Sequence, residues 1–161
     1  MNTSSRFVVA THILTALHVL NERGIGAVKS DFLAESVNTN PVVIRRILGQ
    51  LRKSGLVLSQ VGAGGGFSLG RSAGSMTLLD IHRSVEVGSL YHFHYKQPNQ
   101  SCPIGCTIQD VLQSVFSDAE SAVEGVLRGK TLLDMADQMM ATAKFQECAA
   151  LAEAEGRAPS R

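Results

Sequence analysis

The sequence predicts a mostly helical α+β protein, in which a small β-hairpin follows three helices and a long helix follows an irregular loop. Three observations support this fold class. Apolar residues recur every three or four positions in several segments, helix-capping signals separate those segments, and a glycine run joins two short β-prone stretches. Hydrophobic residues make up 44% of the 161 residues and charged residues 18%, as in an ordinary globular protein with a core of its own.

Two helices are expected before residue 40. Residues 5–22 carry apolar side chains with helical spacing, and the glycines from Gly24 onward end that pattern. Ser30 is a candidate N-cap for a short second helix over residues 31–37, because its hydroxyl can accept a hydrogen bond from a backbone N–H of the first turn. Residues 38–39 then form a turn between this helix and the next one.

The third helix has the strongest local signals of the chain. Asn40 is a preferred N-cap, Pro41 suits the first helical position, and Gly55 is a C-terminal stop after Ser54. One side of this helix is apolar and is expected to face the core, whereas the opposite side is polar and basic. The apolar side consists of Val43, Ile44, Ile47, Leu48 and Leu51, and the basic side of Arg45, Arg46, Gly49, Gln50, Arg52 and Lys53.

A β-hairpin is expected directly after the third helix. Residues 56–60 and 67–69 are short β-prone segments, and the glycine-rich residues 61–66 join them. Three helices followed by such a hairpin, or wing, have the order of a winged helix-turn-helix unit. In a helix-turn-helix, the second helix of the pair enters the major groove of DNA, so the third helix of this chain is the candidate recognition helix.

The C-terminal half is expected to hold a long helix. Thr77 caps a helix that ends near residue 86, and residues 87–101 lack periodicity. Pro103 then begins a helix that keeps one apolar face up to Gly129, roughly 39 Å at the usual rise per residue. The predicted organisation is a winged helix-turn-helix domain (1–86), a sensor loop (87–102), dimerisation helices (103–145, with a last helix over 131–143) and a flexible tail (146–161).

Charge is distributed unevenly between the two halves of the chain. Residues 1–75 contain eight Lys and Arg against three Asp and Glu, whereas residues 76–161 contain seven against eleven. The basic first half is expected to meet a polyanion.

The candidate recognition helix offers side chains that suit DNA. Arg pairs with guanine in a bidentate manner and Asn with adenine, and residues near the N-terminus of a recognition helix face base edges. The other cations of the helix are expected to hold phosphates, and the wing is expected to contact the DNA backbone or the minor groove. The candidate DNA-binding residues are Asn38, Thr39, Asn40, Arg45, Arg46, Gln50, Arg52, Lys53, Ser59, Gln60, Gly64 and Gly65.

Enzyme chemistry is not indicated. The glycine run is followed by Phe67 and a strand, not by the helix that a dinucleotide-binding loop requires, and the motifs of serine hydrolases and zinc peptidases are missing. A different class of function stays open, in which the winged fold binds another protein instead of DNA. The sequence has no apolar run of 18 residues and no signal-peptide pattern, so we expect a cytoplasmic protein without membrane contact.

Cys102 and Cys106 are the candidate redox-sensing residues. Cys102 precedes Pro103 and is expected at the N-terminus of the long helix, where the helix dipole and free N–H groups lower the pKa of a thiol. A larger thiolate fraction makes oxidation faster, and Cys106 lies one helical turn away. Redox sensing, an inert structural role and a small-ligand switch all stay open for these residues, with no cofactor as the first expectation.

Several segments resemble one family of regulators. Residues 36–48 (Ser-Val-Asn-Thr-Asn-Pro-Val-Val-Ile-Arg-Arg-Ile-Leu), 51–57 and 64–69 resemble the Rrf-two (Rrf2) family of winged-helix transcriptional regulators, and residues 6–14 and 102–105 resemble its YwnA-like branch. The resemblance implies a homodimer, built on the long helix, that binds a palindromic double-stranded DNA operator and usually represses transcription. The expected dimer interface is the apolar face of the long helix, at Ile108, Val111, Leu112, Val115, Phe116, Ala119 and Val123.

The same resemblance raises the question of a cofactor. Several members of the family hold a [2Fe–2S] cluster through three Cys before the long helix and one further ligand. This chain has only Cys102 and Cys106 there, and Cys148 lies far along the chain. His12, His92 or His94, or a ligand from the other subunit, would have to complete the set. A cluster is therefore the alternative to thiol sensing at Cys102.

Overall fold

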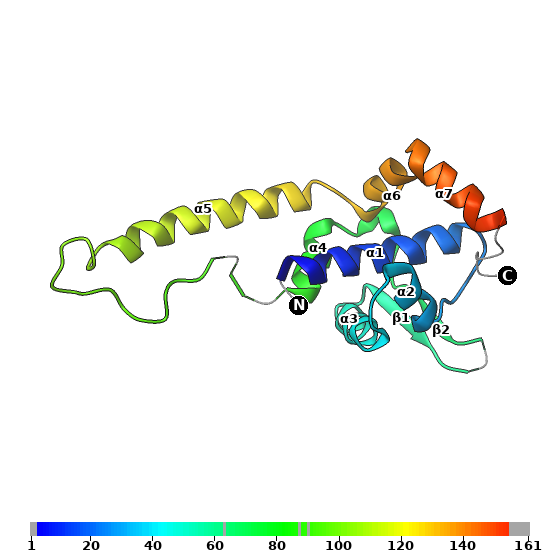
Figure 1. The fold of residues 1–161 in the computed structure, drawn as a ribbon, viewed down its shortest axis with the longest axis horizontal. Coiled ribbons are helices and arrows are strands. Elements are labelled where there is room, and N and C mark those ends of the chain that lie inside the picture. The colour runs from blue at the N-terminus through cyan, green and yellow to red at the C-terminus, as the bar shows by residue number, and fades with distance from the viewer. Residues whose placement is uncertain (1–2, 63, 87, 90, 155–161) are drawn as a thin grey trace.

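The computed structural model describes residues 3–62, 64–86, 88–89 and 91–154, and it consists of a helical body and an extended arm (Figure 1). Helices dominate, and the described residues form one two-stranded sheet, which confirms the predicted α+β class. The elements in chain order are α1 (Thr3–Glu22), α2 (Ser30–Val37), α3 (Pro41–Lys53), β1 (Val57–Gln60), β2 (Gly66–Leu69), the short 3-10 helix η1 (Ala73–Ser75), α4 (Leu78–Val85), α5 (Ile108–Arg128), α6 (Leu132–Met140) and α7 (Ala143–Ala154).

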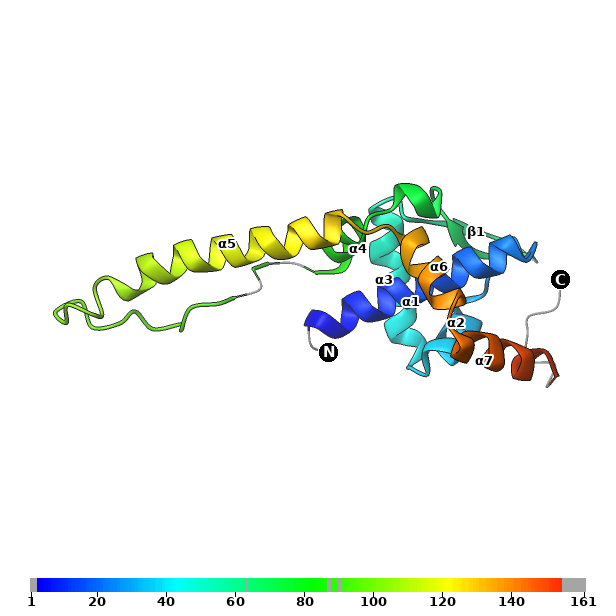
Figure 2. The same cartoon turned by 90° about the horizontal axis from the view of Figure 1, so that it is seen from above.

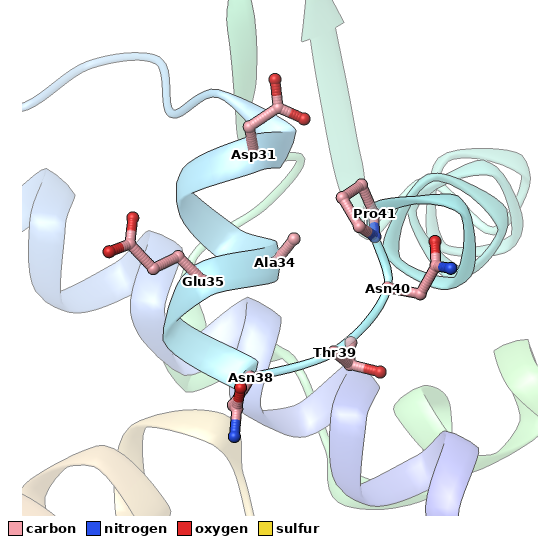
Figure 3. A pocket seen from close by; sticks show the side chains of 7 residues that line it. All are labelled: Asp31, Ala34, Glu35, Asn38, Thr39, Asn40 and Pro41. Atoms are coloured by element: carbon pink, nitrogen blue, oxygen red, sulfur yellow. The ribbon is translucent and has the colours of Figure 1, made fainter.

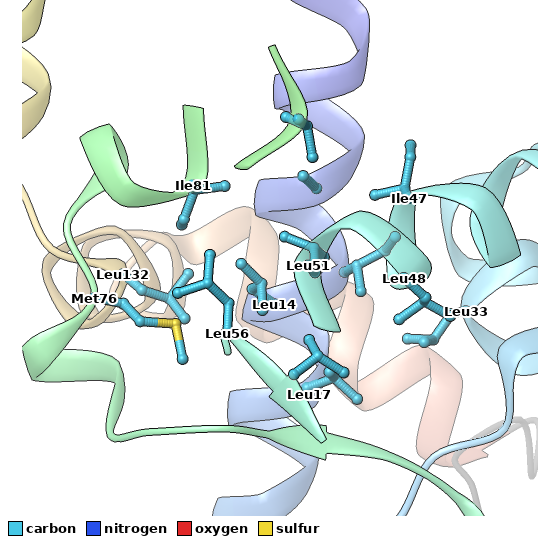
Figure 4. Close-up of a cluster of buried hydrophobic side chains, with 14 of the residues drawn as sticks. Leu14, Leu17, Leu33, Ile47, Leu48, Leu51, Leu56, Met76, Ile81 and Leu132 are labelled. Atoms are coloured by element: carbon cyan, nitrogen blue, oxygen red, sulfur yellow. The ribbon is translucent and has the colours of Figure 1, made fainter. Parts of the chain in front are cut away.

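α1 is the central helix of the body. It contacts α2, α3, α4, α6 and β2, which lie around it (Figures 1 and 2). Because apolar residues recur every three or four positions, one side of α1 faces these neighbours with Ala10, Ile13, Leu14 and Leu17, each at most 2% exposed. These side chains form one hydrophobic cluster with residues of α2, α3, β1 and the later helices, among them Leu33, Leu48, Leu51, Leu56, Met76, Ile81 and Leu132 (Figure 4).

Two asparagines build the turn between α2 and α3. Asn38 adopts a left-handed φ of 53°, which Asn tolerates better than most residues, and it ends α2. The Oδ1 atom of Asn40 accepts a hydrogen bond from the backbone N–H of Val42 at 2.8 Å, so the predicted cap of α3 is confirmed. The predicted cap of α2 is wrong, because Ser30 is already helical and the capping residue is Lys29, without a side-chain hydrogen bond.

The wing is an antiparallel hairpin of β1 and β2, with Val57 opposite Leu69. Backbone hydrogen bonds of 2.9 and 2.8 Å between Val28 and Phe67 attach the hairpin to the segment before α2. A Cβ atom at position 66 would lie 2.7 Å from the carbonyl oxygen of Val28, so Gly66 is required for this close approach of two backbones. The wing is therefore joined to the body at its base.

α4 and α6 begin side by side. Thr77 caps α4 in a capping box with Asp80, as the sequence predicted for Thr77, and Thr131 caps α6 in the same way with Asp134. An antiparallel bridge pairs Thr77 with Thr131, flanked by two backbone hydrogen bonds of 2.8 Å. This bridge attaches the C-terminal helices to the body.

The arm (residues 91–128) consists of an irregular segment and α5, which run side by side away from the body (Figures 1 and 2). α5 begins at Ile108 and not at Pro103 as predicted, because residues 101–107 form a series of turns. With 21 residues it is roughly 32 Å long, and it ends before Gly129 as expected. No residue of α5 is buried. Cys102 consequently lies in the turns before α5 and not at its N-terminus.

Two helices follow the arm where one helix and a tail were predicted. The predicted helix over 131–143 ends at Met140, and α7 covers residues 143–154, which include much of the predicted tail. The hydroxyl of Thr142 accepts a hydrogen bond from the backbone N–H of Phe145 at 3.2 Å and so caps α7. The end of the predicted tail, residues 155–161, lies outside the described residues. Within the described part of the chain, no helix is both long and apolar enough to cross a membrane.

Candidate nucleic-acid interface

The solvent side of α3 is basic. Its apolar side is held in the core, with Ile44 and Leu48 fully buried, so the orientation of the helix is fixed. The predicted cations Arg45, Arg46, Arg52 and Lys53 are all exposed. The 13 residues of α3 include no carboxylate. Such a row of cations attracts the phosphates of a nucleic acid.

Gly49 lies in the middle of this basic side. The four cations of α3 stand three or four residues before or after it, and residues at these spacings are neighbours on a helix surface. A Cβ atom at Gly49 would have no other atom within 4 Å, so nothing in the fold requires a glycine there. Gly49 is not among the predicted DNA-binding residues, although its spacing to the four cations already places it between them on the helix surface.

Arg45 is held by a carboxylate of α2. Its Nη2 atom donates a hydrogen bond to Oδ1 of Asp31 at 2.9 Å. Asp31 lies in the first turn of α2, and the two side chains are 56% and 72% exposed. Asp31 is not among the predicted site residues. It lies 14 positions from Arg45 on a different helix, and sequence periodicity does not indicate contacts between helices.

The C-terminal end of α3 contacts the wing. The Nη1 atom of Arg52 donates a hydrogen bond to the hydroxyl oxygen of Ser59 on β1 at 3.3 Å. Ser59 and Gln60 are both exposed. This hydrogen bond links α3 to the wing, so that the exposed polar groups of the two elements are neighbours.

An open cleft lies between α2 and the N-terminus of α3 (Figure 3). It brings together the three predicted residues Asn38, Thr39 and Asn40, and the carboxylates of Asp31 and Glu35 project from the α2 side. Because the Oδ1 atom of Asn40 already caps α3, the side-chain amide NH₂ is the part of Asn40 that can contact a base. The cleft is acidic on the α2 side and neutral on the α3 side.

The remaining predicted contacts differ in how accessible they are. Gln50 is half-buried, and its Oε1 atom is buried without a hydrogen-bond partner. Gly64 is exposed in the turn of the wing, whereas Gly65 is half-buried and its backbone N–H donates to the carbonyl of Gly62 at 2.9 Å. All three stay predictions as DNA contacts, and Gln50 has the least exposed polar atom of them.

Comparison with known proteins places this architecture in one family. The sequence model described as "Rrf2: Iron-dependent Transcriptional regulator" matches residues 3–138. The chain belongs to the Rrf2 family. YwnA of Bacillus subtilis, named as an HTH-type transcriptional regulator, is 34% identical over 136 residues, which cover 84% of this chain and 98% of YwnA.

Solved structures share the fold over nearly the full length. The crystal structure of a transcriptional regulator from Lactobacillus plantarum has a TM-score of 0.71 with 26% identity, covering 90% of this chain and 96% of that one. The structure of IscR from T. potens has a TM-score of 0.63 with 25% identity, covering 86% and 88%. The chain is thus an Rrf2-type transcriptional regulator with a winged-helix fold, and it is not an enzyme.

In this Rrf2 regulator, Cys102 lies in a tight turn at the tip of the arm. The backbone N–H groups of Gly105 and Ile104 point at its sulfur and lower the pKa of the thiol. The carbonyl of Asn99 accepts a hydrogen bond from the backbone N–H of Cys102 at 3.1 Å and stabilises the turn. The direction of the pKa shift agrees with the sequence-based expectation, but the cause is a turn of backbone N–H groups and not the dipole of α5.

Cys106 belongs to the same turn. Its backbone N–H donates to the carbonyl of Cys102 at 2.9 Å, and its Sγ donates to the carbonyl of Pro103 at 3.3 Å. Cys102 is half-buried and Cys106 exposed, and both are free thiols, as is Cys148 on α7. The two candidate redox-sensing residues therefore lie in the same turn and are joined by a backbone hydrogen bond.

The donors expected for an iron–sulfur cluster do not come together in one chain. Cys102 and Cys106 belong to the turns of residues 101–107, before the N-terminus of α5, which points away from the body (Figure 1), whereas His12 belongs to α1 in the body. His12 Nε2 lies 3.0 Å from the hydroxyl of Ser36, and desolvation lowers the pKa of this His. Among the described residues, no three His, Cys, Asp or Glu side chains are grouped so that they could hold a metal ion. Within the described part of the chain, the residues of a single subunit therefore do not fit a [2Fe–2S] cluster.

The apolar face of α5 is only half covered by its own chain. The rings of Tyr91 and Phe93 pack on Phe116, with centroid distances of 4.7 and 5.3 Å, and cover one side of the helix. Of the expected interface residues, Leu112, Phe116 and Ala119 are half-buried. The others face solvent: Ile108 is 38% exposed, Val111 61%, Val115 54% and Val123 37%.

Proposed function

We propose that this Rrf2 regulator binds a palindromic DNA operator as a homodimer, represses transcription there, and loses affinity when Cys102 is oxidised. The observation that carries the DNA-binding part is the solvent side of α3. It combines four exposed cations, no carboxylate and a contact to the wing through Arg52 and Ser59. The core on the opposite side of α3 leaves this surface free for a duplex.

The side chains of the interface have different tasks in this proposal. Arg45 and the amide group of Asn40 lie in the N-terminal part of α3, so they contact base edges in the major groove. Arg46, Arg52 and Lys53 bind phosphates and set the position of the helix. The wing contacts the backbone beside the groove. Phosphate binding of this kind makes affinity fall steeply with salt.

The exposed apolar side of α5 supports the homodimer. A helix with valines at 54–61% exposure is poorly stabilised by its own chain, and a second copy of α5 would cover them. A dimer with two-fold symmetry places two recognition helices on half-sites about 34–36 Å apart. The spacing of the two recognition helices then depends on how the two arms pack.

The switch uses the thiolate of Cys102. Its sulfur attacks one oxygen of a peroxide, an S–O bond forms and the O–O bond breaks, and the second oxygen leaves as hydroxide, which a proton converts to water. The sulfenic acid can then react with the thiol of Cys106, which forms the disulfide and releases a second water. Both products change the turn at the tip of the dimer arm, so they alter how the arms pack.

Fluorescence anisotropy tests the DNA-binding part. A random-sequence duplex should bind with an affinity that falls as salt rises, and repeated selection from a randomised duplex pool should yield a palindrome. Arg52→Ala should reduce the salt slope by about one unit. An affinity that does not depend on salt would instead favour a winged fold that binds another protein.

A gel shift tests the switch. Metal-free wild type should lose the selected duplex after hydrogen peroxide and regain it with dithiothreitol. Cys102→Ser should bind DNA and ignore peroxide, whereas Cys148→Ser, which removes an exposed thiol of α7, should behave as wild type. A Cys102→Ser variant that still loses DNA on oxidation contradicts the role of Cys102. Visible absorption of anaerobically purified protein would favour a cluster instead.

A further inference from the structure

We infer that Asp31 is a specificity-determining residue of the α3 interface, which orients the guanidinium of Arg45 toward a base edge and disfavours binding to phosphates alone. This inference rests on the proposed DNA-binding function of α3. It concerns a carboxylate on α2, outside the recognition helix itself.

The contact between the two side chains leaves most of the guanidinium available. A guanidinium has five N–H donors in one plane. Arg45 uses Nη2 for its bond of 2.9 Å to Asp31, and this is its one hydrogen bond within the part of the chain that the structure describes. The remaining donors can therefore form the bidentate contact that Arg makes with guanine.

The pair is expected to matter in the complex more than in the free protein. An ion pair as exposed as this one adds little to stability, because water screens it. When a duplex covers α3, water leaves the contact and the attraction between Asp31 and Arg45 strengthens. A guanidinium that is already oriented loses less rotational freedom on binding a base. Variants at Asp31 should consequently change DNA binding without changing thermal stability.

The charge of Asp31 has a separate effect on selectivity. A carboxylate beside the N-terminus of α3 repels phosphates, so a duplex that offers no base contact to Arg45 gains less from binding. Glu35 contributes a similar charge from the same helix and the same cleft (Figure 3). The described contacts include no bond between Glu35 and Arg45. Glu35 therefore separates the effect of charge from the effect of orientation.

Selection from a pool of duplexes with a randomised centre, followed by sequencing, tests the inference. Arg45→Ala identifies the operator position at which Arg45 has its preference. The preference at that position is then measured for wild type, Asp31→Ala, Asp31→Asn and Glu35→Gln, together with the affinity of each for one random duplex. Asp31→Asn removes the charge but keeps an oxygen that can accept from Arg45.

Asp31→Ala should reduce the preference at that position about five- to tenfold, part of what a bidentate contact provides, and should raise the affinity for the random duplex about two- to threefold. Asp31→Asn should keep most of the preference. Glu35→Gln should keep all of it and raise only the affinity for the random duplex. The midpoint of thermal unfolding should be the same for all four proteins.

Two results overturn the inference while the proposed function stands. The first is a preference that Asp31→Ala leaves unchanged. The second is an equal loss of preference in Asp31→Ala and Glu35→Gln, since charge alone would then explain it. A wild type that selects no sequence, or an Arg45→Ala variant that selects the same sequence as wild type, overturns the proposed role of α3 itself and this inference with it.

Discussion

α3 and α5 are both amphipathic helices, but their apolar sides have different environments. In α3, Ile44, Ile47, Leu48 and Leu51 are at most 1% exposed, and the polar side faces solvent. In α5 no residue is buried, and much of the apolar side faces solvent. Because isolated helices are marginally stable in water, α3 is stabilised by its own chain, whereas α5 needs a second surface.

This difference separates recognition from assembly. The chain alone provides the core that orients α3, so the proposed DNA-binding surface is complete in a single chain. The arm contacts the body near the C-terminal end of α5, where Glu124 forms an ion pair of 2.7 Å with Arg83 of α4 and Leu127 packs against the core. In the proposed dimer, a chemical change at the tip of the arm can therefore alter how the two arms pack and leave the structure of α3 intact.

The largest effect is expected from a charge in the exposed apolar side of α5. Val115→Asp should abolish the dimer, because an unpaired carboxylate in an apolar interface is costly. Leu48→Ala in α3 should instead lower the free energy of unfolding by about 2–5 kcal/mol through a cavity in the core. Sedimentation and unfolding at several protein concentrations distinguish the two, since only the dimer contact depends on concentration. A monodisperse wild-type monomer would contradict the proposed role of α5.

A smaller effect is expected from the cations of α3. Arg45→Ala should weaken binding to the selected duplex by about 1–3 kcal/mol and relax the preference at one base position. Arg52→Ala should weaken all duplexes alike, because phosphate contacts do not distinguish sequence. Anisotropy with the selected duplex and a random duplex measures both. If neither variant differs from wild type, α3 is not the recognition helix.

The fold was predictable from the sequence wherever the signal is local. The cap at Asn40, the cap at Thr77 and the hairpin depend on a few neighbouring residues, and the structure contains all three. The sequence predicts that α5 starts at Pro103, because Pro is common at the first helical position. Pro suits a turn equally well, and α5 starts at Ile108. The sequence does not predict α7 over residues 146–154 of the expected tail, because an Ala- and Glu-rich segment has weak amphipathicity, although its helix propensity is high.

The site was predictable only in part, for the same reason. The cations of α3 follow from helical periodicity, and the structure exposes each of them. The bond between Asp31 and Arg45 and the separation of His12 from Cys102 depend on how helices pack, and single-sequence periodicity contains no information on such distances. The lowered pKa of the Cys102 thiol was expected. Its cause, however, is the backbone N–H groups of a turn at residues where the sequence predicts the start of a helix.

Two glycines refine the comparison between α3 and α5. Gly49 and Gly125 both lie inside helices, and neither would have an atom within 4 Å of an added Cβ. Gly49→Ala and Gly125→Ala should each raise the free energy of unfolding by about 0.5–1 kcal/mol, because Ala is the better helix former. Gly49→Ala should also weaken DNA binding, since the added methyl group would occupy the open space between the four cations, where the DNA would approach α3. Chemical unfolding and anisotropy measure the two effects, and unchanged DNA binding in Gly49→Ala would show that the gap has no role.

The smallest effect is expected at the capping boxes of α4 and α6, where these two helices begin side by side. Burial alone would raise the pKa of Asp80, but the backbone N–H and hydroxyl of Thr77 and the guanidinium of Arg71 outweigh it and lower that pKa below 3.8. The backbone N–H and the hydroxyl of Thr131 likewise lower the pKa of Asp134. Since both carboxyl groups have a lower pKa in the folded than in the unfolded protein, each stabilises the fold above about pH 4, and this contribution is lost as pH falls through the lowered pKa.

Asp80→Asn and Asp134→Asn should therefore unfold at a lower urea concentration than wild type at pH 7, and the difference should shrink as the pH falls below 4. Asp80→Asn should show the larger change, because it also removes the negative charge of the ion pair of 2.7 Å with Arg71. Asp134 is fully exposed to solvent, which screens its interactions. The difference in urea concentration from wild type could instead be the same at pH 7 and below pH 4. The capping geometry, and not the charge of the carboxylates, would then stabilise the junction between α4 and α6.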